Sequence, residues 1–104
     1  MGNLRIMPDD NGKQVYQRSV ELLEADIKGE LVALEPRSGA CFGFNGVATA
    51  VWRMLEQPQS FDEIRNRLLA EFEVGQEQCT AELDDLLTSM RDQGLVSVSR
   101  SSPL

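Results

Sequence analysis

Residues 29–55 read GELVALEPRSGACFGFNGVATAVWRML, and this stretch carries the most informative folding signals of the chain. It contains two short β-prone runs, Glu30 to Glu35 and Ala40 to Phe44, separated by the turn-forming residues Pro36 to Gly39. Asn45 is a suitable N-cap for a helix that begins immediately afterwards. The stretch therefore predicts strand, turn, strand and helix. A strand so short that runs directly into a helix indicates a small sheet with an exposed edge, and extended peptides bind at such edges.

The residues before this stretch predict one more strand. Residues 20–27 partly alternate between apolar and polar side chains, although a helical turn there is an open alternative. Lys28-Gly29 then reverses the chain, which gives a three-stranded antiparallel meander. Residues 1–18 combine turn formers with isolated apolar residues, so we expect a flexible lead-in or a loosely docked arm.

Three helices are predicted after the meander. The first runs from about Gly46 to Glu56, the second begins at a capping box formed by Ser60 and Glu63, and the third runs from about Gln76 to Gln93. Gly94 fits the position that follows a helix C-terminus. The apolar faces at helical spacing consist of Val47, Val51, Trp52 and Leu55, then Phe61, Ile64, Leu68 and Phe72, then Cys79, Leu83, Leu86, Leu87 and Met90.

This order of elements predicts a small α+β domain in which a three-stranded antiparallel meander is followed by three helices. The second and third helices resemble a helix-turn-helix pair, so we expect a winged-helix-like topology. The domain is expected over residues 19–99, after the arm at 1–18. Val96 to Val98 could add a short final strand, and residues 100–104 are expected to fray.

Composition excludes several classes of function. The chain has 104 residues and a net charge of −7, and an acidic surface repels nucleic acid. It has no histidine, the usual general base, and its two cysteines lie far apart, so we expect no catalysis, no metal site and no cofactor. No apolar run is long enough to span a membrane, and the N-terminus lacks a signal-peptide core, which favours the cytoplasm.

The sequence resembles the PqqD-like proteins, the peptide-recognition domains of ribosomally made, modified peptides. The resemblance covers about residues 20–98. It rests on Gly29-Glu30-Leu31-Val32-Ala33-Leu34, Gly39, Cys41-Phe42-Gly43-Phe44-Asn45, Val51-Trp52, Glu82-Leu83, Leu86-Leu87, Met90 and Gly94-Leu95-Val96. Two features depart from the family pattern: Cys41 and Gly43 occupy a strand that is often richer in tyrosine, and Glu82 stands where Asp is common.

The resemblance implies a non-catalytic clamp for a precursor peptide. The leader segment would add an antiparallel strand to the third strand and rest against the third helix, as in lasso-peptide, PQQ and radical-enzyme pathways. The implied partners are the leader and a maturation enzyme (a protease, cyclase or radical SAM enzyme), and a homodimer stays open. The expected peptide-binding residues are Leu34, Ala40, Cys41, Phe42, Gly43, Phe44, Glu82, Leu83, Leu86, Leu87 and Met90.

Physical chemistry refines the expected groove. Phe42 and Phe44 point to the opposite face from Cys41 and Gly43, and we expect the two aromatic rings to belong mainly to the core. Gly43 either admits a partner backbone or marks a bulge. Some of the apolar residues Leu83, Leu87 and Met90 of the third helix should line the groove, because a core this small cannot hold all three. Trp52 should be structural, with an indole N–H that needs a partner.

Two other functions are open at this point. A winged-helix protein can bind DNA through its third helix, but this helix displays Glu77, Glu82, Asp84, Asp85 and Asp92 with Arg91 as its one cation. The chain could instead be a structural adaptor of an enzyme and never touch the peptide. Binding of a leader without the enzyme separates the adaptor from the clamp.

Overall fold

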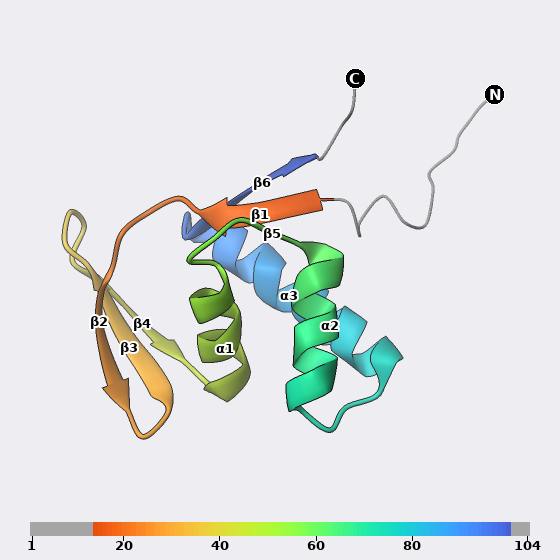
Figure 1. Ribbon diagram of the computed structural model, residues 1–104. Helices are drawn as coiled ribbons and strands as arrows, with labels where there is room; N and C mark the ends of the chain where they lie inside the picture. The colour runs from red at the N-terminus through yellow and green to blue at the C-terminus, as the bar shows by residue number, and fades with distance from the viewer. Residues whose placement is uncertain (1–13, 101–104) are drawn as a thin grey trace.

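The computed structural model describes residues 14–100 (Figure 1). The predicted α+β, winged-helix-like fold is confirmed, with a three-stranded antiparallel meander followed by three helices. In chain order, the elements are β1 (Gln14–Arg18), β2 (Leu23–Ile27), β3 (Glu30–Glu35), β4 (Ala40–Phe44), α1 (Gly46–Met54), β5 (Gln59–Ser60), α2 (Phe61–Glu71), α3 (Gln76–Asp92) and β6 (Val96–Arg100).

The meander is a sheet in the order β2-β3-β4, so β4 lies at one edge. Lys28 and Gly29 connect β2 to β3 with φ values of 56° and 88°, as a two-residue turn of the mirror-image type requires. Facing pairs include Ala25 with Val32 and Val32 with Gly43. The first strand begins at Leu23 rather than at Val20 as predicted, and the alternative of a helical turn is wrong.

A second sheet, in the order β5-β1-β6, is absent from the sequence prediction except for β6. The sequence predicts residues 14–18 as part of the arm, but they form β1 and pair along their whole length with β6, from Gln14 opposite Arg100 to Arg18 opposite Val96. Arg100, expected to fray, is the last residue of β6. The remaining residues of the expected arm and tail, 1–13 and 101–104, lie outside the described residues.

The helix ends follow the capping signals in the sequence. The Asn45 side chain accepts a hydrogen bond from the Ala48 amide at 2.9 Å, and Ser60 and Glu63 form a reciprocal capping box. Gly94 adopts φ 79° after α3, and the Leu95 amide donates to the Met90 carbonyl at 2.9 Å. This hydrogen bond ends the helix and requires a left-handed conformation at position 94, which glycine adopts more easily than other residues.

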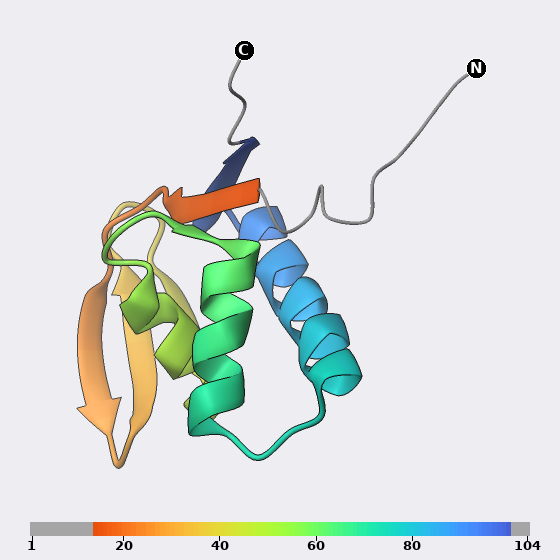
Figure 2. The same cartoon turned by 45° about the vertical axis from the view of Figure 1, so that its right-hand side comes forward.

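The core lies between the inner face of the meander and the three helices, with α2 and α3 side by side (Figure 2). Trp52, Val51 and Ile64 have no exposed surface, and Trp52 meets Phe44 edge to face at 5.7 Å between ring centroids. Leu83 and Leu87 are each 1% exposed and Met90 is 3% exposed. The expectation that this core could not hold all three is therefore wrong, since α2 and the β1–β6 sheet add enough cover.

Candidate functional site

The free edge of β4 presents the main-chain groups of Cys41 and Gly43. The two-residue turn makes Ile27 and Glu30 a hydrogen-bonded pair, and such pairs recur at every second residue. The backbone groups of Val32 therefore face β2, while those of its neighbours in β3 face β4. The backbone N–H and C=O groups of Phe42 and Phe44 point back toward β3. Cys41 and Gly43 alternate with these residues, so their backbone N–H and C=O groups point away from β3, to the free edge of the sheet.

An open groove lies between this edge and α3. It encloses about 270 Å³. Its lining comes from β4, the start of α1, the last two turns of α3 and the residues just after α3: Cys41, Phe42, Gly43, Phe44, Ala48, Leu86, Ser89, Met90, Gln93 and Leu95. Phe42 and Leu86 are half-buried. Met90 and Leu95 are almost fully buried and form the floor of the groove. The groove thus combines an apolar floor with an unpaired strand edge.

The structure brings some of the expected site residues together and separates others. Cys41, Phe42, Gly43, Phe44, Leu86 and Met90 line the groove. Leu83 and Leu87 do not line it, because they are buried on the core side of α3. Leu34 lies on β3 opposite Cys41, Ala40 lies at the start of β4, and Glu82 is an exposed residue one turn before Leu86. Sequence reasoning missed Ala48, Ser89, Gln93 and Leu95.

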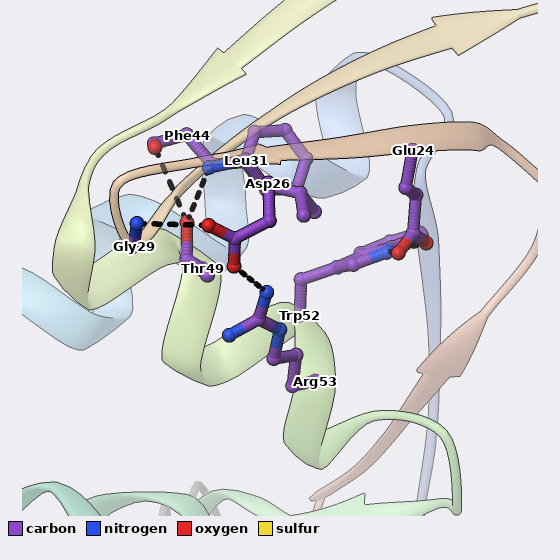
Figure 3. A network of polar contacts seen from close by, with 8 residues as sticks. All are labelled: Glu24, Asp26, Gly29, Leu31, Phe44, Thr49, Trp52 and Arg53. Carbon is purple, nitrogen blue, oxygen red and sulfur yellow. Dashed lines mark hydrogen bonds and ion pairs between the residues drawn. The ribbon is translucent and has the colours of Figure 1, made fainter.

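Thr49 fixes the end of β4 to the sheet (Figure 3). Its buried hydroxyl accepts a hydrogen bond from the Leu31 amide at 3.0 Å and donates to the Phe44 carbonyl at 3.2 Å. The hydroxyl bridges the two strands where they diverge toward α1. Buried main-chain groups require such partners, so Thr49 sets the position of the groove's Phe44 wall.

Arg18 and Glu24, which form an ion pair with each other at 3.8 Å, both contact Trp52. The indole N–H donates to the Glu24 carboxylate at 2.8 Å, and the Arg18 guanidinium lies 4.3 Å from the centroid of the indole ring. Arg18 also donates to the Trp52 carbonyl at 2.6 Å. The expected structural role of Trp52 and its need for a partner are confirmed. The cluster ties β1, β2 and α1 together behind the groove.

Two carboxylates stabilise the hairpin turns of the meander. The Arg53 guanidinium binds Asp26, and the Gly29 amide donates to the same carboxylate at 2.8 Å (Figure 3). These contacts, Arg53 first, hold the pKa of Asp26 below its usual range. Glu35 accepts hydrogen bonds from the Ser38 hydroxyl and the Arg37 amide in the β3–β4 turn, which lowers the pKa of Glu35 as well.

A larger depression of about 870 Å³ lies between the β1–β2 connection and the β3–β4 turn. Three of the charged side chains in its walls already bind groups of the protein itself. Arg18 and Glu24 hold Trp52, and Glu35 holds its own turn. Several of the charged groups of the depression are therefore engaged within the protein, whereas the groove presents unpaired main-chain groups and an apolar floor.

The surroundings of the groove are acidic. The five acidic residues that the sequence places on the outer side of α3 are all exposed, so this helix would repel a phosphate backbone. Within residues 14–100, no group of three or more Cys, Asp or Glu side chains is arranged to hold a metal ion. No helix in this range is long and apolar enough to cross a membrane.

An open strand edge beside a helix is a feature at which other small domains bind extended chains. The model of the family described as coenzyme PQQ synthesis protein D (PqqD) matches residues 30–96, and the chain belongs to this family. No curated protein matches the sequence.

Two solved structures are similar to this chain. TbiB1 in complex with the TbiA(beta) leader peptide is 27% identical with a TM-score of 0.69, and the match covers 78% of this chain and 94% of that one. Lasso peptide synthetase B1 complexed with the leader peptide is 25% identical with a TM-score of 0.64, and the match covers 79% of this chain and 96% of that one. Both similar proteins are therefore complexes with leader peptides.

Proposed function

We propose that this protein is a non-catalytic binding protein for the leader of a ribosomally made precursor peptide. Its family and the two similar leader-peptide complexes support this class of partner. The observation that carries the proposal is the groove itself. In it, an unpaired strand edge and an apolar helix face line one opening, and nothing in the described residues covers them.

The leader adds to β4 as an antiparallel strand. The amides and carbonyls of Cys41 and Gly43 supply main-chain hydrogen bonds, which tolerate variation in the leader sequence. Leader side chains on the inner face enter the groove between Phe42 and Leu86. Each apolar side chain buried there contributes about 1.5–3 kcal/mol before the cost of association.

Charge selects among leaders. Glu82 and Asp85 lie one helical turn before Leu86 and Ser89, so they extend the groove-facing side of α3. Both are exposed, and a leader with Lys or Arg beyond its apolar residues gains attraction there. This attraction is screened by salt, so it acts mainly on the rate of association.

The bound leader is presented to a maturation enzyme, which is a protease, a cyclase or a radical SAM enzyme. Lasso-peptide maturation is one precedent, since one of the similar structures is lasso peptide synthetase B1 complexed with the leader peptide. We propose that leader binding takes place in the cytoplasm, a reducing compartment in which an exposed thiol such as that of Cys41 stays free.

Backbone amide shifts test the proposal. Random peptides displayed on phage are selected against the full chain, and the best binder is titrated into ¹⁵N-labelled protein. We expect the largest shift changes at residues 40–44 and on the last two turns of α3. Changes confined to the outer side of α2, or to the depression near Arg37, would overturn the proposal.

The TbiA(beta) leader peptide, whole and with its sequence scrambled, provides a natural comparison in the same titration. Preference for the whole leader over the scrambled one supports recognition of leaders as a class. Because the titration contains no enzyme, it also separates the clamp from a structural adaptor, which would show no change with the leader peptide, whole or scrambled.

A further inference from the structure

The outer face of the meander is apolar, although it covers no core. The rows of facing residues place Leu23, Leu34 and Cys41 side by side, and Ala25, Val32 and Gly43 beside them. Within residues 14–99, the large hydrophobic side chains that stand out as exposed are Leu23 at 61%, Ile27 at 57% and Val32 at 43%, and all three lie on this face. An apolar face that reaches the free edge of β4 is continuous with the groove around that edge.

Gly43 makes a gap in this face at the edge. A Cβ atom built there meets nothing within 4 Å, and the backbone does not require glycine through a positive φ. The glycine therefore leaves open space where every other residue type would place a side chain. A glycine inside a strand commonly marks the close approach of a ligand or another backbone.

An added strand places one side chain over this gap. The residue that pairs with Gly43 has its side chain on the same face as Gly43, and its two neighbours point into the groove. Val32 is two strand spacings away from the added strand, roughly 10 Å. A long, flat side chain reaches across the glycine to Val32, and aromatic residues are known to cover edge glycines in this manner.

We propose that the bound peptide carries an aromatic residue opposite Gly43, and that its ring lies over Gly43 on the outer face and contacts Val32. This inference rests on the proposed function, because it assumes the added strand. It defines a second subsite outside the groove, on the opposite face of the sheet. Specificity then has two parts, with apolar residues inside and one aromatic ring outside, at neighbouring positions of the same peptide.

Peptides selected from the displayed library provide the test, and the methyl signals of Val32 provide the direct readout. We expect an aromatic residue to be enriched at one position, an upfield ring-current shift of the Val32 methyls, and nuclear Overhauser contacts between them and the ring. A ring that contacts Leu86 and Phe42 instead would overturn the inference and leave the proposed function intact.

Affinities in a double-mutant cycle supply the second readout. Replacing the aromatic residue of the peptide with alanine should weaken binding to the wild type about tenfold. The same replacement should change binding little when Gly43→Val fills the gap. Gly46→Ala, at a glycine of α1 with equally open surroundings, is the matched control and should keep the tenfold difference.

Val32→Ala is the variant for the case in which Gly43→Val fails to fold. It removes the methyls that the ring contacts, and it should reduce the tenfold difference without abolishing binding. An equal difference in Val32→Ala, Gly43→Val and wild type contradicts the inference. Failure of every selected peptide to perturb β4 contradicts both the inference and the proposed function.

Discussion

The indole N–H of Trp52 donates a hydrogen bond of 2.8 Å to the carboxylate of Glu24, and this bond joins α1 to β2 across 28 positions of the chain. Trp52 has no exposed surface, so its N–H has no access to water. The Arg18 guanidinium lies over the indole ring, 4.3 Å from its centroid, and its nearest nitrogen is 3.8 Å from the Glu24 carboxylate. The orientation of the meander, and hence of β4, depends on this cluster.

Glu24→Ala should destabilise the fold by about 1–3 kcal/mol, because a buried donor loses its acceptor. Glu24→Gln keeps an acceptor oxygen and should cost less. Urea unfolding measures both. Glu21→Ala, at an exposed residue in the preceding connection, is the control and should change the midpoint little. Equal midpoints for Glu24→Ala and Glu21→Ala would show that the bond contributes nothing.

Thr49→Val should cost about 1–3 kcal/mol, since the Leu31 amide and the Phe44 carbonyl both lose their bridging hydroxyl. Thr49→Ser retains the hydroxyl and loses one methyl, which costs about 0.8 kcal/mol. Chemical denaturation should therefore rank Val below Ser. The reverse order would show that the methyl group, rather than the bridge, is what the fold needs.

Cys41→Pro should weaken peptide binding while the domain stays folded. The Cys41 amide faces the free edge, so proline removes a donor that a peptide needs and leaves the pairing with β3 intact. Loss of one such hydrogen bond should cost about 0.5–1.5 kcal/mol, and steric exclusion by the ring adds to it. Calorimetry with a selected peptide measures the change.

Cys41→Ala is the matched control, because it removes the thiol but keeps the amide. It should bind the peptide as the wild type does. A folded Cys41→Pro variant with unchanged affinity would argue strongly against strand addition at this edge.

Gly43→Val should stabilise the free protein by about 0.5–1 kcal/mol. Glycine is unfavourable within a strand by that amount, and the new side chain meets no neighbour. Thermal unfolding gives the measurement, with Gly46→Ala as the comparison at a helix terminus. A destabilised Gly43→Val variant would show that the space above Gly43 is not open in solution.

Arg53→Gln should raise the pKa of Asp26 toward its ordinary value of about 4. In the folded protein, Arg53 and the Gly29 amide lower the pKa of Asp26, so its stabilising contribution is complete above the unfolded value. The contribution is lost as the pH falls through the lower, folded value. Carboxyl NMR titration measures the shift. The pKa of Glu35, which is lowered by its own turn, should not move, and a fixed Asp26 pKa would contradict the assignment.

The local signals in the sequence were sufficient for the meander, the helices and their ends. Lys28-Gly29, Asn45, the Ser60–Glu63 box and Gly94 each act within a few residues, so their effects can be read without knowing the rest of the chain. The second sheet could not be read in this way. β1 is short, and its main partner β6 lies some 80 positions later, so only the folded chain brings the two together.

The groove shows the same division. That β4 would be short, apolar and exposed followed from its composition and from the helix that begins beside it. The sequence pattern did not indicate which side of α3 faces β4. Leu86 and Leu87 are neighbours in the sequence, yet Leu86 lines the groove and Leu87 is buried in the core. Adjacent positions on a helix differ by about 100° of rotation, so the pattern alone does not settle which leucine faces out.

The class of fold, the strand that ends the meander and the absence of histidine all follow from the amino-acid sequence alone. The folded chain was needed to show that residues 14–18 belong to a sheet, that Arg18 and Glu24 both contact Trp52, and that Leu86 rather than Leu83 or Leu87 faces the open edge. The reason is physical. Turns and helix caps are fixed by contacts within a few residues, whereas the burial of a side chain depends on which distant parts of the chain meet in the folded protein.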